Sequence, residues 1–281
     1  ALIDIREGVA AGTALDIQQA APLFGFDTRV TGHTDPAAMA GAEMVIVTAG
    51  FPRKPGMSRS DVLDANLKVI DSVLDDVLRF APDAMLLMVT NPVDVLTYYA
   101  WKRTGWDRAR VVGQAGVLDA SRMASFVALE TGFSALDIQA MVLGGHGDAM
   151  VPLVRYTTIA GIPIDHFLDR EAVARIVERT RQGGTEILAL KKGSSAYGAP
   201  AASIAAMVDA ISHNRRRVLS CVAPLQGEYG QPDIAVGVPA VLGAKGIERV
   251  VELAMTPQEA AWFAESIAHI RADIARLPNL D

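Results

Sequence analysis

Cysteine is nearly absent from this chain, because Cys221 is the only one among 281 residues. An intrachain disulfide is therefore impossible, and nothing in the sequence indicates an oxidising compartment. The five histidines show no paired spacing, so we expect no metal site. No apolar run reaches the length of a membrane span and no signal peptide is visible. These absences together predict a cytoplasmic protein without a membrane partner.

Basic charge is also scarce, with 26 Lys and Arg residues against 32 Asp and Glu residues and a net charge of -6. The one dense basic cluster is Arg215 to Arg217, which is most simply a solvated turn before a strand. Nucleic acid is therefore not an expected partner. Hydrophobic residues make up 51% and charged residues 21%, a composition typical of a folded chain of two domains or one large domain.

The chain opens on Ala1, and residues 1–5 already read as the middle of a strand. We therefore expect a further segment before Ala1. In a nucleotide-binding fold, such a segment would hold the glycine loop that cradles phosphates.

The first half alternates between predicted strands and helices. Residues 9–24 and 63–77 have apolar side chains at helical spacing. Short or continuous apolar strands are predicted at 28–31, 44–47 and 85–89. This alternation predicts an α/β fold with a doubly wound parallel sheet, in which ligands bind beyond the carboxyl ends of strands. By that rule, the candidate ligand-binding positions are Asp4, the residues from Thr48 onward, and Asn91.

Asp4 ends the first strand, where a carboxylate can accept hydrogen bonds from an adenosine ribose and favour NAD over NADP. The alternatives are a solvated acid, or a 2'-phosphate held by the neighbouring Arg6. Residues 50–59 contain two prolines and two glycines, which predict a long loop. Arg53 and Arg59 on that loop are suited to grip carboxylates, or else they are simply solvated.

Residues 144–148, GGHGD, follow the apolar run 138–143, which predicts a histidine presented at the end of a strand. A histidine in that place is suited to proton transfer near neutral pH, whereas a structural turn is the alternative. Asp119 and Arg122 lie three residues apart on a predicted helix face. Either they form a local salt bridge, or they diverge, with Asp119 toward His146 and Arg122 toward a substrate carboxylate. Asn91 is either a turn residue or a ligand for a substrate oxygen.

The regular alternation ends near residue 117, so we predict a dinucleotide-binding domain over 1–116 and a mixed α+β substrate domain over 117–281. Its predicted helices are 172–181, ending at Gly183 and Gly184, then 201–211, and a final helix after the capping box that Thr256 and Glu259 form. Strands at 217–222, 234–238 and 247–253 predict an antiparallel sheet with a turn at 243–246.

Five stretches, in order, carry a family resemblance: GFPRKPGMSR at 50–59, VTNP at 89–92, GVLDASR at 116–122, GGHGD at 144–148 and GSSAYGAP at 193–200. With these motifs the chain resembles the malate dehydrogenases of the branch related to lactate dehydrogenases, over essentially its whole length. The resemblance implies a Rossmann-type sheet, NAD as cofactor, oxidation of malate in the tricarboxylic acid cycle, and a homodimer or homotetramer. Helix faces near 9–24 and 201–211 are the candidate subunit contacts.

The resemblance also implies a role for each site residue. His146 would be the proton acceptor, Asp119 would orient it, and Arg122 would bind the carboxylate next to the reacting carbon. Arg59 would polarise the substrate carbonyl and Arg53 would bind a second carboxylate, which favours malate over lactate. Asn91 would contact substrate and nicotinamide. The positions that match the family's cofactor contacts are Asp4, Asn66, Asn91 and the Val89 backbone.

One departure from the family is large, because its first strand, glycine-rich loop and first helix, roughly thirty residues, are not in this sequence. The alternatives are therefore a lactate or other 2-hydroxy acid dehydrogenase, or a truncated chain that is catalytically silent. A Ser-His-Asp hydrolase is disfavoured, because the sequence has no G-x-S-x-G motif.

Overall fold

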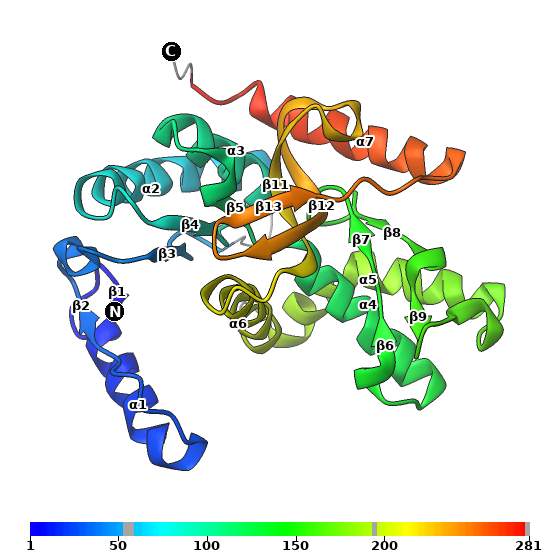
Figure 1. Cartoon of the computed structure of the whole chain (residues 1–281), viewed down its shortest axis with the longest axis horizontal. Helices are drawn as coiled ribbons and strands as arrows, with labels where there is room; N and C mark the ends of the chain where they lie inside the picture. The colour runs from blue at the N-terminus through cyan, green and yellow to red at the C-terminus, as the bar shows by residue number, and fades with distance from the viewer. Residues whose placement is uncertain (53–58, 193–195, 279–281) are drawn as a thin grey trace.

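A six-stranded mixed sheet forms the centre of the computed structural model, which describes residues 1–52, 59–192 and 196–278 (Figure 1). The strand order is β13-β12-β11-β5-β4-β3. Three neighbours, β3 (Met44–Val47), β4 (Met85–Met88) and β5 (Val111–Gly113), run parallel, as the continuous apolar runs predict. The other three, β11 (Arg217–Gln226), β12 (Pro232–Gly243) and β13 (Gly246–Val250), are antiparallel. The predicted α/β fold is confirmed.

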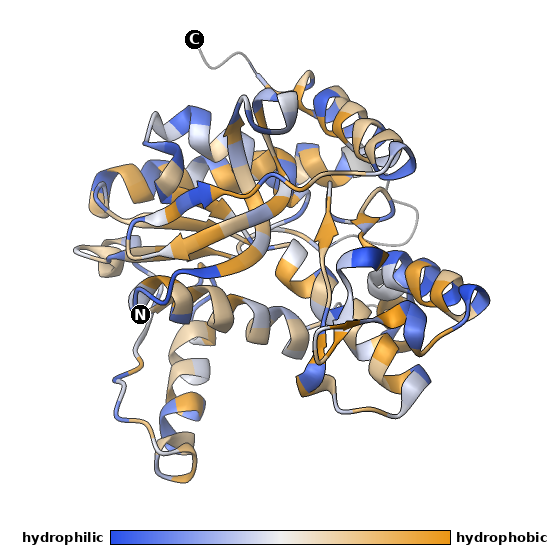
Figure 2. Ribbon diagram, turned by 45° about the vertical axis from the view of Figure 1, so that its right-hand side comes forward, coloured by the Kyte–Doolittle hydropathy of each residue, from blue (hydrophilic) through white to orange (hydrophobic). Residues whose placement is uncertain are grey.

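Helices cover both faces of this sheet. On one side lie α2 (Arg59–Phe80), α3 (Val93–Thr104) and α7 (Pro257–Ile274), and on the other lie α4 (Gly116–Thr131) and α6 (Gly198–Ser212) (Figure 1). Figure 2 shows the central strands as predominantly hydrophobic, as burial on both faces requires. In α2 the predicted helical stripe is buried, at Leu63, Ile70, Leu74 and Val77.

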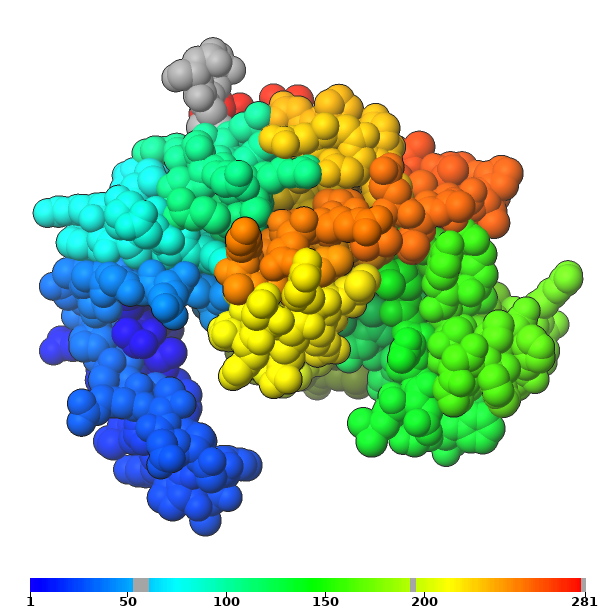
Figure 3. Space-filling model, viewed as in Figure 1, coloured from blue at the N-terminus to red at the C-terminus, as the bar shows by residue number. Residues whose placement is uncertain are grey.

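The start of the chain forms a small lobe that projects from the main body in the space-filling view (Figure 3). It contains β1 (Leu2–Ile3), α1 (Val9–Phe24) and β2 (Gly32–His33), and β1 pairs with β2 in a separate parallel sheet. The prediction of a strand at 28–31 is wrong, since the pairing begins at Gly32. The reason is steric: a β-carbon on Gly32 would lie 2.1 Å from the carbonyl oxygen of Ala10, so only glycine lets β2 approach α1 this closely.

The apolar run 138–143 is two strands rather than one. Its first part, β6 (Ile138–Gln139), pairs with β9 (Thr158–Ile159), which also pairs with β10 (Ile162–Pro163). Its second part, β7 (Val142–Leu143), pairs instead with β8 (Val151–Pro152). The chain therefore changes partner within one hydrophobic segment, and the periodicity of that segment does not reveal the change.

Helix α5 (Arg170–Lys191) continues through Gly183 and Gly184, so the prediction that it ends there is wrong. These glycines serve close packing instead. A β-carbon on Gly183 would lie 3.1 Å from Cδ of Arg122, so the absence of a side chain lets α5 lie against α4. The predicted hairpin is confirmed, with Gly243 opposite Gly246. The capping box is confirmed as well, because Thr256 and Glu259 exchange side chain to backbone hydrogen bonds.

The sheet crosses the predicted domain boundary at residues 116 and 117, because Val222 of β11 pairs with Gly113 of β5. The two halves of the sequence therefore share one sheet and one core, and the boundary stays a prediction.

Among the described residues, no helix has the length and apolar character needed to cross a bilayer.

A backbone bridge fixes the 144–148 segment to this sheet. Gly144 N–H donates a hydrogen bond of 2.8 Å to the carbonyl oxygen of Gly237 in β12. A β-carbon on Gly237 would lie 2.4 Å from the Gly144 oxygen. The bridge therefore requires glycine at position 237.

We predict that Gly237→Ala lowers the free energy of unfolding by about 1–3 kcal/mol, because the methyl group has to displace backbone. The control is Gly12→Ala in α1, where an added β-carbon meets no atom within 4 Å. Alanine is the better helix former there, so stability stays equal or rises by up to about 1 kcal/mol. Urea unfolding followed by circular dichroism measures both. Equal midpoints for Gly237→Ala and the parent protein would show that the bridge carries no stability.

Candidate active site

The GGHGD segment is held by three elements that lie far apart in the sequence. Gly144 is bonded to β12 as described, and Gly145 N–H donates to Oγ of Ser266 in α7 at 2.7 Å. His146 N–H donates to Oδ2 of Asp94 in α3 at 2.9 Å. Gly144 and Gly147 have φ values of 82° and 124°, which favour glycine. The glycines thus allow a sharp turn, and three successive amides fix its position.

The imidazole of His146 is bonded to Asp119, as the sequence predicts. Nδ1 of the ring lies 2.9 Å from Oδ2 of Asp119, which sits in the first turn of α4 and is 2% exposed. A carboxylate can only accept, so Nδ1 carries the proton of this bond. In the neutral ring, Nε2 is then left with a free lone pair. This is the tautomer that a proton acceptor needs.

Opposing effects set the affinity of His146 for a proton. Burial of the ring disfavours the charged form, but the charge and the hydrogen bond of Asp119 outweigh burial and raise the pKa of His146 above its usual 6.5. The cation of Arg122 works against protonation, and the anion of Asp94 works for it. The site therefore stabilises an imidazolium that is largely buried.

Arg122 binds the same carboxylate as His146. Its Nη1 lies 3.0 Å from Oδ1 of Asp119, and the Arg122 side chain is 12% exposed. The salt bridge and the contact of Asp119 with His146 are thus both present, and the binding of a substrate carboxylate by Arg122 stays a prediction. The Nε of Arg122 is buried and has no hydrogen-bond partner in the described part of the chain. A guanidinium beside the imidazole is suited to a carboxylate ligand.

Asn91 lies at the carboxyl end of β4, and its side chain is exposed. Its carbonyl oxygen accepts a 2.8 Å hydrogen bond from Nδ2 of Asn66, a residue only 1% exposed. Asn66 also accepts the N–H of Phe51 at 2.6 Å. Asn66 therefore joins the loop after β3 to the loop after β4, and its contact with a cofactor stays a prediction. Val89 N–H donates to Val47 in β3, which places it at the same sheet edge.

Arg53 lies outside the described residues, and so does the side chain of Arg59, whose backbone begins α2. The roles predicted for these two arginines stay predictions. The structure does describe Gly50, which lies between the end of β3 and residue 53. A β-carbon on Gly50 would lie 2.6 Å from Cγ2 of Thr90 and 2.9 Å from Oδ1 of Asn66. Gly50 therefore lies close against the side chains of Thr90 and Asn66.

Asp4 directly follows β1, as predicted, and is held there by Arg6. Arg6 Nε and Nη2 lie 3.1 Å and 2.9 Å from the two carboxylate oxygens. The hydrogen bonds from Arg6 lower the pKa of Asp4 to about 2, so the acid is ionised. Arg6 is thus paired with Asp4 rather than turned toward an empty anion site. A ribose hydroxyl at Asp4 would share its oxygens with this guanidinium.

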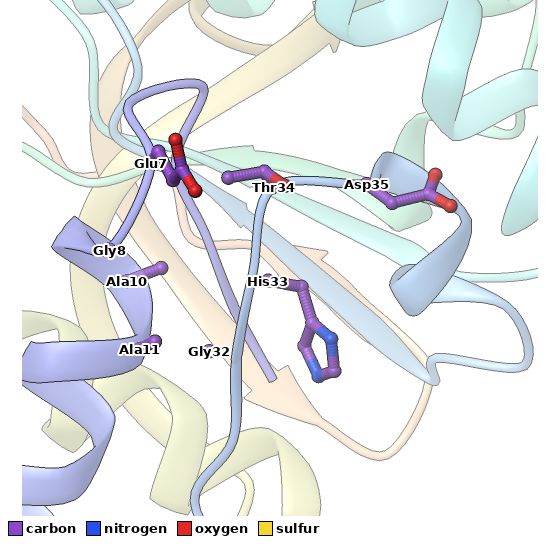
Figure 4. Close-up of a pocket in the computed structure, with 8 residues that line it drawn as sticks. All are labelled: Glu7, Gly8, Ala10, Ala11, Gly32, His33, Thr34 and Asp35. Carbon is purple, nitrogen blue, oxygen red and sulfur yellow. The ribbon is translucent and has the colours of Figure 1, made fainter.

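A cavity of about 330 Å³ opens beside this strand end, between the start of α1 and β2. Figure 4 shows Gly8, Ala10 and Ala11 facing Gly32 and His33 across it. Small residues leave room for a flat ring or a sugar, and Glu7 and Asp35 give the rim acidic character. Acidic side chains of this kind disfavour a phosphate group beside them. No cluster of His, Cys, Asp or Glu that is suited to a metal ion occurs in residues 1–52, 59–192 and 196–278.

Sequence reasoning missed two residues that support the site, Asp94 and Ser266. Both are fully buried. The signal for Asp94 is present in the sequence, since a carboxylate stands between Val93, Val95 and Leu96 in an otherwise apolar stretch. A buried acid needs a partner, and here that partner is the backbone of His146. Ser266 gives no such signal, because a serine in a helix is most often on the surface.

Comparison with known proteins finds matches along nearly the whole chain. The profile of the lactate/malate dehydrogenase NAD binding domain matches residues 1–113, and that of the lactate/malate dehydrogenase alpha/beta C-terminal domain matches residues 116–279. A curated malate dehydrogenase of Thioalkalivibrio sulfidiphilus is 67% identical over 276 residues, which cover 98% of this chain and 90% of that protein.

Two solved structures are similar over nearly the full chain. The malate dehydrogenase of Cryptosporidium parvum has a TM-score of 0.94 at 37% identity and covers 97% of this chain and 88% of its own. The lactate dehydrogenase of the same organism, complexed with lactic acid and nicotinamide adenine dinucleotide, has a TM-score of 0.94 at 36% identity, covering 99% and 90%. By these matches, the chain belongs to the lactate/malate dehydrogenase family.

Proposed function

We propose that this protein is an NAD-dependent malate dehydrogenase in which His146 accepts the hydroxyl proton of malate. The observation that carries the proposal is the buried Arg122–Asp119–His146 chain, which holds a base and a carboxylate-binding cation side by side. High identity to a relative named malate dehydrogenase supports the same reaction. The lactate dehydrogenase alternative is not favoured by that identity, although the fold is common to both.

The reaction divides the two hydrogens of malate between two acceptors. The hydroxyl proton passes to Nε2 of His146, and the carbon–oxygen single bond becomes the carbonyl of oxaloacetate. NAD, when bound, takes the hydride that leaves the same carbon. Asp119 stabilises the imidazolium as it forms, so the site does not gain an unpaired buried charge. In the reverse direction His146 returns its proton to the growing alkoxide.

Three arginines serve the dicarboxylate in this proposal. Arg122 binds the carboxylate next to the reacting carbon. Arg53 binds the second carboxylate, and a methyl group at that place would leave its charge unpaired. Arg59 polarises the carbonyl of oxaloacetate. Asn91, exposed at the end of β4, contacts the substrate and the nicotinamide.

NAD is held at the carboxyl ends of the parallel strands. The cavity beside Gly8 and Gly32 takes the adenosine part, and the ionised Asp4 accepts hydrogen bonds from its ribose. The residues proposed to support the nicotinamide end are Asn66, Asn91 and the Val89 backbone. The division into a cofactor domain over 1–116 and a substrate domain over 117–281 belongs to this proposal.

The proposal includes a homodimer or homotetramer, a cytoplasmic location and a role in the tricarboxylic acid cycle. Helix α1 supports the oligomer, because several of its large apolar side chains are exposed: Leu15, Ile17, Leu23 and Phe24. In the space-filling view this helix stands apart from the body, with an open notch between it and α6 (Figure 3). Apolar surface of this kind marks protein contacts.

The first test is NADH oxidation with oxaloacetate and with pyruvate. We expect a strong preference for oxaloacetate, and His146→Asn should lower kcat by about 10²–10⁴-fold because the proton acceptor is lost. His166→Asn is the matched control, since His166 also contacts an aspartate, Asp165, but is exposed. Turnover that survives in His146→Asn, or a preference for pyruvate, would refute the proposal.

A second test addresses Arg53. We predict that Arg53→Gln lowers the ratio of kcat/KM for oxaloacetate to that for pyruvate by about 10–100-fold, because a charged hydrogen-bond partner of the second carboxylate is removed. Arg175→Gln, a change of the same kind at an exposed ion pair with Glu130, should leave the ratio unchanged. If the ratio in Arg53→Gln equals that of the parent protein, Arg53 has no part in specificity.

A third test addresses assembly. Light scattering of the purified protein should give the mass of a dimer or tetramer, and Leu23→Asp combined with Phe24→Asp should shift it toward the monomer, because charge is placed in an apolar contact. Leu136→Asp, at a side chain that is 93% exposed on another surface, is the control. A monomeric parent protein contradicts the oligomer, and an unchanged mass in the double variant excludes this end of α1 from the contact.

A further inference from the structure

Asp94 is a fully buried carboxylate outside the set of residues to which a role has been assigned. It lies in the first turn of α3 with Val93, Val95 and Leu96, all of them at most 1% exposed. An ionised group in such surroundings is costly unless hydrogen bonds and favourable charges compensate for the loss of water. Its position in the first helical turn supplies part of that compensation, because the N-terminal end of a helix favours negative charge.

One contact of Asp94 is with the main chain of His146. Oδ2 accepts the His146 N–H at 2.9 Å, joining α3 to a loop 52 residues further along the chain. The neighbouring amides of the loop bind a neutral carbonyl, on Gly237, and a neutral hydroxyl, on Ser266. Of these three anchors, Asp94 alone brings a carboxylate. Geometry alone does not require a charge here, since a neutral oxygen suffices at the other two amides.

Within the described part of the chain, three charged side chains from two elements act on the His146 ring. Asp119 and Arg122 come from α4, and Asp94 comes from α3. The two aspartates favour the protonated ring, whereas Arg122 and burial oppose it. With Arg122 paired to Asp119, a single anion would leave the imidazolium and the guanidinium to share one carboxylate. Asp94 adds a second negative charge that favours the imidazolium.

We propose that Asp94 is a positioning residue for the hydride-transfer reaction: it fixes His146 through its backbone amide and, as a buried anion, stabilises the imidazolium form. The inference rests on the proposed role of His146 as proton acceptor. Asp94 itself touches neither substrate nor cofactor in this proposal. It acts through the placement and the charge state of the histidine.

Three variants separate the effects of position and charge. Asp94→Asn keeps an oxygen acceptor of the same size and removes only the charge. Ser266→Ala removes the adjacent anchor on Gly145 and leaves all charges in place. Asp75→Asn is the control for loss of a carboxylate elsewhere, since Asp75 is exposed and paired with Arg103 on the outer surface.

The first readout is the pH dependence of kcat/KM for malate oxidation, which requires neutral His146. Loss of the anion makes the imidazolium less stable, so in Asp94→Asn the acid limb of the profile should move to lower pH by about half a unit or more. The alkaline limb of oxaloacetate reduction, which requires the protonated ring, should move in the same direction. Ser266→Ala should lower kcat without moving either limb, and Asp75→Asn should change neither quantity. An acid limb in Asp94→Asn that coincides with that of the parent protein would overturn the electrostatic role.

The second readout is independent of turnover. The imidazole of His146, followed by NMR in the protein without substrate, should titrate at lower pH in Asp94→Asn than in the parent protein. If Asp94→Asn does not fold, hydrogen exchange in the parent protein decides: a slowly exchanging His146 amide supports the bond to Asp94, and an amide that exchanges as fast as exposed ones overturns it. A parent protein with no malate turnover but with this His146 titration behaviour would refute the proposed function and leave the role of Asp94 intact.

Discussion

The hydrogen bond between Asp119 and His146 is the constraint around which the rest of the site is arranged. It fixes the ring in one orientation and one tautomer, and it favours the charged ring despite burial. A carboxylate that is 2% exposed also needs compensation before any proton arrives, and Arg122 supplies it at 3.0 Å. The site can therefore pass between the neutral ring and the imidazolium without exposing an unpaired charge to a low-dielectric interior.

Two sets of elements divide the work of holding that histidine. Helix α4 fixes the side chain through Asp119, while α3, α7 and β12 fix the backbone through Asp94, Ser266 and Gly237. The glycines on either side of His146 belong to this arrangement, because Gly144 would carry a β-carbon only 2.8 Å from Oγ of Ser266. The histidine is thus held by regular secondary structure on both its side chain and its backbone.

Much of the fold and the centre of the site follow from the sequence. Periodicity predicts α1 and the buried face of α2 correctly, and the motif pattern predicts that Asp119 meets His146. Local sequence patterns mispredict an element where an atom far away in the sequence determines its structure. Gly183 and Gly184 read as a helix end because their partner, Arg122, is 61 and 62 residues away in the sequence. The strand after α1 begins at Gly32 rather than at residue 28. At Gly32 the strand lies directly against the backbone of Ala10, where only glycine fits. Asp94 was missed because burial, which makes its charge significant, is not a local property.

The long sequence separations between contacting residues at the site affect how the protein folds. The bonds that hold the GGHGD segment reach across 27, 52 and 121 positions of the chain. Contacts of this kind form late, because the entropy cost of closing a long loop must be overcome before the contact contributes favourable free energy. Strands β3, β4 and β5 precede Gly237 and Ser266 in the sequence, so a chain made from its amino terminus has these strands before it has those two anchors. The histidine therefore gains its full set of backbone contacts only when β12 and α7 are both in place.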